Sequence, residues 1–281
     1  MVRFRMNRFR AGLLLVAALV LYFNGISIAG DLDRFRGLKG TLEIAGGTAH
    51  LPVMAEAARR IHDFNPDIFI SVTGGGTACG IQKVGDGLVD IGNTGRALTE
   101  AERARYRLVS HPLALDGIAV AVNTENPVAG FSSEQVDMIF TGRIDNWQEL
   151  GGANAPIVRY CREKGSATLE VFEKKLLRGD LLAECNSVSS NGAMRNIISL
   201  DRNGIGYLSI GHLGSEKVKA VAIDGVVPSQ QNALSGKYTV ARTLFMNTGP
   251  SPSRLTTLFV EYLKSPEGAE IIKDAGYIPI R

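Results

Sequence analysis

The sequence predicts an α/β fold of two lobes, and three observations support this prediction. The chain has 281 residues, which suits two domains of ordinary size better than one compact core. Strand-like segments alternate with helix-like segments at the interval that favours βαβ units and a mostly parallel sheet. Two further strand-like segments, near 115–124 and 236–245, interrupt the alternation, and we interpret them as crossings between the lobes.

The elements of the first lobe follow from the spacing of apolar residues. The segment that ends at Phe64 predicts a helix, because its apolar residues recur at helical spacing and Pro52 stands in the first turn, where its missing N–H costs nothing. A second helix is expected from about Ala78. The strands predicted for this lobe are 40–45, 67–73 and 88–92.

The second lobe repeats the alternation after the first crossing. Its predicted helices are 132–140, 166–177 and 190–200, and its predicted strands are 157–161 and 205–209. Two final helices, 253–264 and 266–275, follow the second crossing and return the chain to the first lobe. The expected division is 36–118 plus 240–281 for the first lobe and 119–239 for the second.

Composition and charge exclude several classes of protein. With 45% hydrophobic and 21% charged residues, the chain is not disordered, not collagen-like and not a polytopic membrane protein. Residues 1–29 hold four of the 31 basic residues and none of the 28 acidic ones. The remainder has 27 basic residues, so its net charge of −1 argues against nucleic-acid binding through a basic surface.

The N-terminus has the pattern of an export signal. Four arginines precede an apolar run of 13 residues from Ala11 to Phe23, and Ser27-Ile28-Ala29 offers a small-x-small cleavage site. This run is short for crossing roughly 30 Å of hydrocarbon. We expect residues 1–29 to be a cleaved signal peptide and the protein to be periplasmic, or outside a cell with one membrane. A retained membrane anchor is the alternative.

Cysteine and histidine spacing gives no support for a metal site. No CxxC, HxxxH or HExxH pattern occurs among the three cysteines and four histidines, so we expect neither metal nor cofactor. Cys161 and Cys185 are a possible disulfide pair in an oxidising compartment. The sequence leaves open whether they come close enough to bond.

Three segments place a small hydroxyl residue between a strand and the start of a helix. They are Gly46-Gly47-Thr48-Ala49, Gly75-Gly76-Thr77-Ala78 and Gly165-Ser166-Ala167-Thr168. Helix N-termini leave backbone N–H groups unpaired, a hydroxyl adds a donor, and glycine permits close approach. Each segment alone would suit an ordinary N-cap. Together, with Arg162 nearby, they predict a site for a small oxyanion, and no P-loop or dinucleotide motif accompanies them.

Further motifs follow these segments in order over nearly all of residues 38–281. They include Val89-Asp90-Ile91-Gly92, Asp116-Gly117-Ile118-Ala119-Val120, Ile139-Phe140-Thr141-Gly142-Arg143-Ile144-Asp145-Asn146-Trp147, Gly204-Ile205-Gly206-Tyr207 and Ser265-Pro266-Glu267-Gly268. In this order and spacing, the motifs resemble the PstS-like periplasmic phosphate-binding proteins of ABC transporters.

The resemblance implies a two-lobe, type II-like periplasmic-binding-protein fold with two crossover strands as a hinge. It further implies a non-enzymatic protein that closes on inorganic phosphate and delivers it to a membrane permease. We expect a monomer. Two alternatives stay open: a binder or sensor of another oxyanion, and an enzyme that acts on a small phosphorylated substrate through Cys79 or Ser166.

The resemblance also implies a ligand set of hydroxyl donors, backbone amides and one cation. The matching residues are Thr48, Ala49, Thr77, Thr94, Arg162, Ser166, Ala167 and Thr168. Arg162 matches the cation of the second lobe, and Ala167 acts only through its N–H. Thr94 or Asn93 would replace a ligand, because Gly95 stands where the family carries Asp or Ser.

Several positions depart from the family pattern and leave the identity of the anion open. Lys164 stands where some members carry a carboxylate, Ala167 replaces a glycine, and Leu169 replaces a common arginine. The class of small oxyanions is therefore a firmer expectation than phosphate itself.

Three other residues have two interpretations each. Asp116, where the chain crosses between the lobes, either orients Arg162 or acts as a hinge group, or it is a turn aspartate. Arg96 either adds charge to the cleft or pairs with an acid such as Asp90. Trp147 is expected to pack in the core rather than to stack on a ligand.

Overall fold

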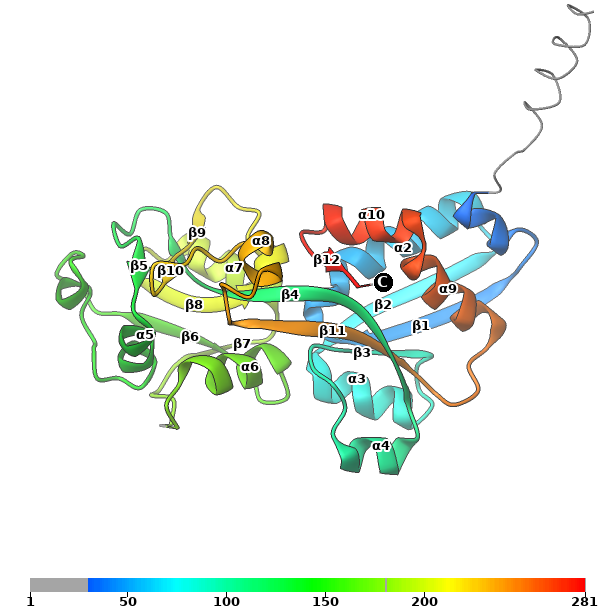
Figure 1. Cartoon of the computed structure of the whole chain (residues 1–281), viewed down its shortest axis with the longest axis horizontal. Coiled ribbons are helices and arrows are strands. Elements are labelled where there is room, and N and C mark those ends of the chain that lie inside the picture. The colour runs from blue at the N-terminus through cyan, green and yellow to red at the C-terminus, as the bar shows by residue number, and fades with distance from the viewer. Residues whose placement is uncertain (1–29, 180, 281) are drawn as a thin grey trace, which may run out of the picture.

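The computed structural model describes residues 30–179 and 181–280, which form two α/β lobes joined by two extended strands (Figure 1). The expected signal peptide at 1–29 lies outside the described residues. Within the described part of the chain, no helix is long and apolar enough to cross a membrane.

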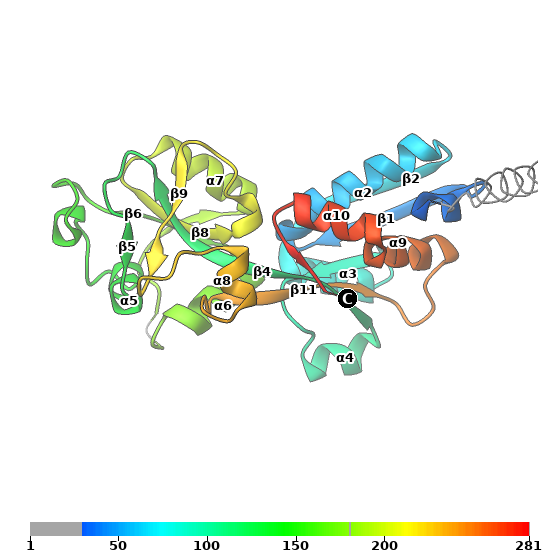
Figure 2. The ribbon, with the colours of Figure 1, turned by 45° about the horizontal axis from the view of Figure 1, so that its top comes forward.

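The first lobe is built on three parallel strands. β1 (Gly40–Gly46) lies between β2 (Ile68–Gly75) and β3 (Ile91–Thr94). One face of this sheet carries α2 (Leu51–Phe64), α9 (Arg254–Lys264) and α10 (Pro266–Asp274) (Figure 2). The other face carries α3 (Gly76–Gly85), against which α4 (Glu100–Tyr106) packs.

The second lobe also has a parallel centre. β6 (Val158–Arg162) lies between β7 (Asn186–Val188) and β8 (Gly204–Ser209). α5 (Ser133–Phe140) and α6 (Ala167–Leu176) pack on one side, and α7 (Asn191–Leu200) packs on the other. The smaller elements are β5 (Gly130–Phe131), β9 (Val218–Ala220), β10 (Ala222–Ile223) and α8 (Gln230–Leu234).

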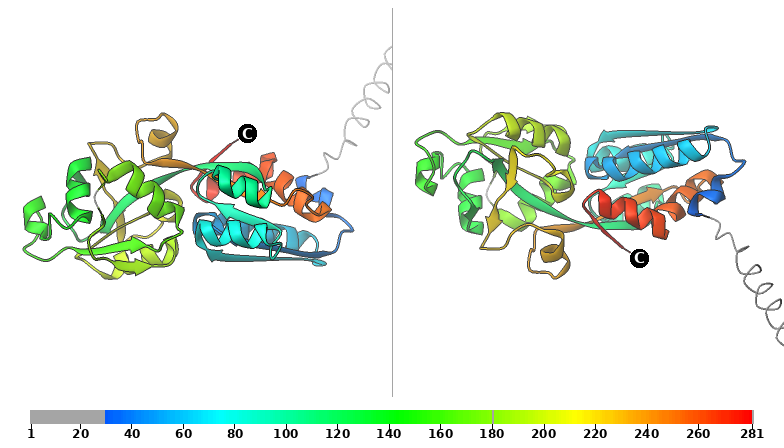
Figure 3. Two further views of the ribbon diagram at one scale, coloured as in Figure 1. Left: turned by 90° about the horizontal axis from the view of Figure 1, so that it is seen from below. Right: turned by 90° about the horizontal axis from the view of Figure 1, so that it is seen from above.

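The two lobes share a sheet through their crossing strands. β4 (Val109–Asn123) pairs antiparallel with β11 (Ala241–Thr248) over its first part and with β8 over its second. The strand order is therefore β2-β1-β3-β11-β4-β8-β6-β7, and β12 (Ile278–Pro279) pairs with β4. Seen from below and from above, the crossing strands bridge the two bodies along one side (Figure 3).

Each body has its own hydrophobic core. One cluster of buried side chains draws on residues 35–114 and 244–277, and the other draws on residues 118–240. Because burial of apolar side chains is the main stabilising term in folding, two separate clusters allow the bodies to move against each other without breaking either core.

Five predicted helices are confirmed to within one residue at each end: 132–140, 166–177, 190–200, 253–264 and 266–275. All five helices follow a serine. In four of them the serine hydroxyl accepts a hydrogen bond from the backbone N–H of the third helical residue, and Ser166, before α6, is the exception. The strand predicted at 88–92 is shifted. It begins at Ile91 and runs through Thr94, and the side chain of Leu88 is 68% exposed.

Candidate anion-binding site

A small enclosed cavity lies where the lobes meet. The space open to the centre of a water-sized sphere is about 10 Å³, which is about the least that holds one water molecule. Its lining residues are Gly47, Thr48, Ala49, His50, Gly76, Thr77, Gly95, Arg162, Ser166, Ala167, Thr168 and Arg242. The lining is therefore rich in hydroxyl and guanidinium groups, which suit a small anion.

Seven of the eight predicted site residues line this cavity, and Thr94 does not. The Thr94 hydroxyl donates to the carbonyl of Arg96 (2.8 Å) and accepts from the amide nitrogen of Asn247 (3.1 Å). Since β3 continues through Thr94 and pairs it with Phe245 of β11, its hydroxyl is committed to neighbouring groups. Asn93 is likewise outside the lining.

The cavity hydroxyls are not consumed by capping. Ser166 occupies the N-cap of α6, but its side chain makes no capping hydrogen bond. Gly75 is the N-cap of α3, which places Thr77 inside the helix, and Gly47 precedes the short 3₁₀ turn that contains Thr48. The hydroxyls therefore remain available for other partners, contrary to the ordinary N-cap interpretation.

Thr48 connects the first lobe to the second. Its hydroxyl oxygen accepts from the side-chain amide of Asn191 at 3.0 Å, from the backbone N–H of Asn191 at 3.3 Å and from Arg162 Nη2 at 3.5 Å. All three residues are buried. This contact holds the lobes together at the wall of the cavity.

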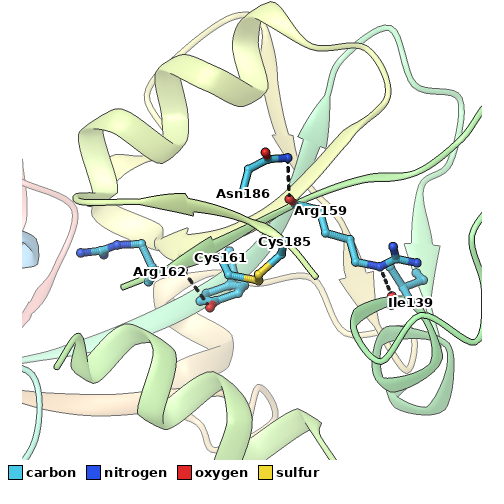
Figure 4. Close-up of a disulfide and its surroundings, with 7 residues drawn as sticks. Ile139, Arg159, Cys161, Arg162, Cys185 and Asn186 are labelled. Carbon is cyan, nitrogen blue, oxygen red and sulfur yellow. Dashed lines mark hydrogen bonds between the residues drawn. A yellow bond between two sulfur atoms is a disulfide. The ribbon is translucent and has the colours of Figure 1, made fainter. Parts of the chain in front are cut away.

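Arg162 is fixed at the end of β6 by carbonyl groups. Its Nε donates to the carbonyl of Val188 (3.0 Å) and its Nη2 to the carbonyl of Ser189 (2.8 Å). Cys161 and Cys185 form the disulfide that the sequence left open. The Arg162 guanidinium extends away from this bond (Figure 4). The bond joins β6 to the segment that supplies the two carbonyls.

One end of the Arg162 guanidinium remains unpaired. Nη1 is buried and has no hydrogen-bond partner among residues 30–179 and 181–280. Burial, together with the nearby positive charge of Arg242, lowers the pKa of Arg162 to about 10, so the side chain is still cationic at neutral pH.

Arg242 is the site residue that sequence reasoning missed. Its Nε donates to Asp116 Oδ2 (3.0 Å) and its Nη1 donates to the Thr168 hydroxyl (3.0 Å). Its Nη2 lies 3.0 Å from Asp116 Oδ2 as an ion pair, but it makes no hydrogen bond within the described part of the chain. The partner of Asp116 is thus Arg242, and the predicted pairing with Arg162 is wrong.

The pairing follows from the register of the crossing strands. Arg242 of β11 stands directly opposite Asp116 of β4 in the antiparallel ladder. Cross-strand neighbours of this kind interact through their side chains. The signal in the sequence was an arginine in the second crossing, but only the register shows which acid it faces.

Gly95 provides the room for this second guanidinium. A Cβ atom at Gly95 would lie 2.7 Å from Arg242 Nη1 and 3.1 Å from the Ala167 methyl group. Its backbone N–H donates to the Thr77 hydroxyl at 3.0 Å. The departure from the family pattern at Gly95 is therefore coupled to Arg242.

The cavity carries excess positive charge. Arg162 and Arg242 both line it, whereas Asp116 stands behind Arg242. Burial lowers the pKa of His50 to about 3, with a smaller contribution from Arg242, so this imidazole is neutral. Burial raises the pKa of Asp116, while Arg242 acts in the opposite direction. Two cations against one paired carboxylate make the site attractive to an anion.

The remaining predicted residues lie elsewhere. Trp147 is 1% exposed and packs against Phe131 in the core of the second lobe, as expected. Arg96 pairs with acids, as one of its two interpretations expected, but the acids are Glu102 and Glu170 and not Asp90. Cys79 has a free thiol that does not line the cavity. Among the described residues, no group of three or more His, Cys, Asp or Glu could hold a metal ion.

Comparison with known proteins agrees with this geometry. Residues 36–267 match the family described as the PBP superfamily domain. The phosphate-binding protein PstS of Bacillus subtilis is 36% identical over 243 residues, which cover 86% of this chain and 81% of that protein. The chain belongs to the PstS-like members of the PBP superfamily.

Solved structures extend this assignment. A structure from Clostridium perfringens, whose description names a phosphate ABC transporter substrate-binding protein with bound phosphate, is 30% identical with a TM-score of 0.81. An ABC-type phosphate transport receptor from Vibrio cholerae is 29% identical with a TM-score of 0.67. Each match covers 86% of this PstS-like chain and 100% of the solved chain. The predicted family and two-lobe fold are thereby confirmed.

Proposed function

We propose that this PstS-like protein captures inorganic phosphate between its lobes and delivers it to the membrane permease of an ABC transporter. The observation that carries the proposal is a pair of buried arginines. Both line one small cavity, Arg242 is already paired with Asp116, and Arg162 keeps its Nη1 without a hydrogen-bond partner in the described chain. A buried guanidinium left this way is costly unless an anion completes its hydrogen bonds.

The proposal includes a location and a division into lobes. Residues 1–29 act as a cleaved signal peptide, and the protein works as a monomer in the periplasm. Residues 36–118 and 240–281 form the lobe that supplies Thr48 and Thr77. Residues 119–239 form the lobe that supplies Arg162 and the start of α6. Closure brings the two sets of donors around the anion.

The lining of the cavity favours a binder over an enzyme. Ser166 shares the cavity with His50, whose Nδ1 lies 3.1 Å from the carbonyl of Gly47. The Nε2 of His50 has no hydrogen-bond partner in the described chain, so this imidazole is not paired with the Ser166 hydroxyl as the base of a serine nucleophile would be.

Titration calorimetry of the mature protein, residues 30–281, with phosphate tests the function. Wild-type protein should bind one phosphate, and Arg162→Ala should weaken binding at least about 100-fold, since it removes charge-assisted hydrogen bonds in a buried site. Lys164→Ala is the matched control. It removes a cation from the same loop, but the Lys164 side chain is exposed and does not line the cavity. Unchanged affinity in Arg162→Ala would show that the site is misassigned.

A further inference from the structure

A disulfide stands directly beside one cation of the anion site. Cys161 immediately precedes Arg162 in β6, and Cys185 immediately precedes β7 (Figure 4). Cys161 is buried in the core of the second lobe, and Cys185, which is partly buried, packs against the same core. The bond therefore ties the start of β7 to the strand that carries the cation.

The two carbonyls that hold Arg162 lie between two anchors. The guanidinium donates to the carbonyl of Val188 at 3.0 Å and to the carbonyl of Ser189 at 2.8 Å. On their C-terminal side, Ser190 caps α7 by accepting the backbone N–H of Ala193 at 3.0 Å. On their N-terminal side, the anchor is the disulfide.

The pairing of β7 is a short constraint by itself. β7 is the last strand in the order of the sheet, and it pairs with β6 over three residues. Two of these, Asn186 and Ser187, are exposed. Between α6 and β7, the described residues form no helix or strand. A short edge strand with few buried side chains has little local stability, so the disulfide supplies a constraint that the pairing lacks.

The backbone of Arg162 has a separate support. Its N–H donates to the Tyr207 hydroxyl at 3.0 Å, and the Tyr207 ring stacks on Phe172 of α6, with 3.8 Å between the ring centroids. Both aromatic rings are buried. Loss of the disulfide would thus leave the end of β6 in place and release the carbonyls that orient the guanidinium.

We propose that the Cys161–Cys185 disulfide positions Arg162 for the anion by fixing the two carbonyls that hold its guanidinium. The inference rests on the proposed function and adds a positioning element to the same site. Both carbonyls are neutral, so they direct the guanidinium without cancelling its charge, and the buried Nη1 is left for the guest. Because a guanidinium binds an oxyanion through N–H groups of fixed direction, breaking the disulfide lowers anion affinity while the protein stays folded.

The first test reduces the disulfide in the mature protein that carries Cys79→Ala, where Cys161 and Cys185 are the remaining cysteines. Dithiothreitol gives two electrons and two protons to the two sulfurs and closes into its own cyclic disulfide. Alkylation followed by mass spectrometry counts the new thiols. Equilibrium dialysis with radiolabelled phosphate should show about tenfold weaker binding. Oxidised glutathione, which takes the electrons and protons back, should restore the affinity.

The outcomes of this test separate the two proposals. Equal phosphate affinity in the oxidised and reduced states would overturn the positioning role and leave the proposed function intact. If the oxidised protein bound no phosphate, the proposed function would fail as well. Unfolding of the reduced protein in the absence of urea would also overturn the inference, which requires a folded protein without the bond.

The second test distinguishes positioning from a general loss of stability. Cys161→Ala/Cys185→Ala should weaken phosphate binding about tenfold in the wild-type background but less than about twofold beside Arg162→Lys, because lysine has no planar fork for two carbonyls to orient. Trp147→Phe is the control, since it changes the core of the same lobe and should leave the affinity of the folded protein unchanged. Equal losses in both backgrounds would show that the disulfide does not act through Arg162.

Discussion

Two of the contacts between the lobes depend on different forces: the buried contacts at the anion cavity, and the ion pair between Arg96 and Glu170, which we call the rim. In the cavity, buried Thr48 accepts from Asn191 and Arg162 across the interface. On the rim, Arg96 of the first lobe bonds Glu170 of α6 at 2.6 Å, with side chains 23% and 39% exposed. Salt screens the rim pair far more than the buried contacts. We infer that the buried contacts at the cavity contribute most of the free energy of lobe closure and that the rim ion pair adds a smaller, salt-dependent contribution.

The rim is also organised before the lobes meet. Arg96 makes two hydrogen bonds to Glu102 of its own lobe, each 2.9 Å long. The hydrogen bond from Arg96 is the largest cause that lowers the pKa of Glu102, which falls to about 2. Because Arg96 is held in place, less side-chain entropy is lost when Glu170 arrives.

The largest effect is expected from Arg242→Gln in the cavity. The substitution leaves Asp116 buried without its cation, which costs roughly 3–5 kcal/mol of unfolding free energy. Anion binding should fall below detection. Urea unfolding and calorimetry measure the two effects. The double variant Asp116→Asn/Arg242→Gln should recover much of the stability but not the binding, and full binding by either variant would contradict the role of Arg242.

The second largest effect is expected from acid, which should lower the free energy of unfolding through buried histidines at and near the cavity. In the unfolded chain His50 and His212 take up a proton below about pH 6.5, but in the folded chain burial delays this to about pH 3 and pH 4. Protonation thus favours unfolding, and stability falls between pH 6.5 and pH 4, by about 3 kcal/mol for His50. Asp116, whose pKa is raised, acts in the opposite direction.

Unfolding in urea at pH 7, 5.5 and 4 measures this loss. His50→Gln should flatten the dependence of the unfolding free energy on pH. His62→Gln changes an exposed histidine of α2 and should keep the wild-type slope. If the unfolding free energy of all three proteins depended on pH with the same slope, His50 would not be the cause of the loss of stability in acid.

Thr48→Val should have an intermediate effect. It removes the hydroxyl that joins the lobes and a donor to the anion, so affinity should fall about 10- to 100-fold. Thr94→Val is the matched control, because Thr94 lies outside the lining and its loss should change stability but not the affinity of the folded protein. Calorimetry on both variants distinguishes a ligand-binding threonine from a structural one.

The smallest effect is expected at the rim. Glu170→Gln should weaken anion binding about two- to fivefold at low salt, and the difference should disappear near 1 M salt. Glu173→Gln on the same helix is the control and should bind as wild type does. If the Glu170 variant kept its deficit at high salt, the rim contact would not be electrostatic.

Much of the fold could be read from local patterns. Apolar spacing located the helices, because this signal acts within a few residues. The strand at 91–94 was misplaced, since Leu88 has the character of a strand residue and its exposure depends on the tertiary fold. The short strands at 130–131 and 222–223 were not predicted, because they gain their pairing only from each other.

The sequence by itself determined the two-lobe α/β plan, the Gly-hydroxyl segments and Arg162, because helix starts and their donors are local properties. Tertiary structure alone decided that Arg242 enters the cavity opposite Asp116, that Gly95 leaves space for it, and that Thr94 faces elsewhere. The physical reason is register: a residue's partner across two strands more than 100 positions apart depends on how the strands align, and no local pattern specifies that alignment.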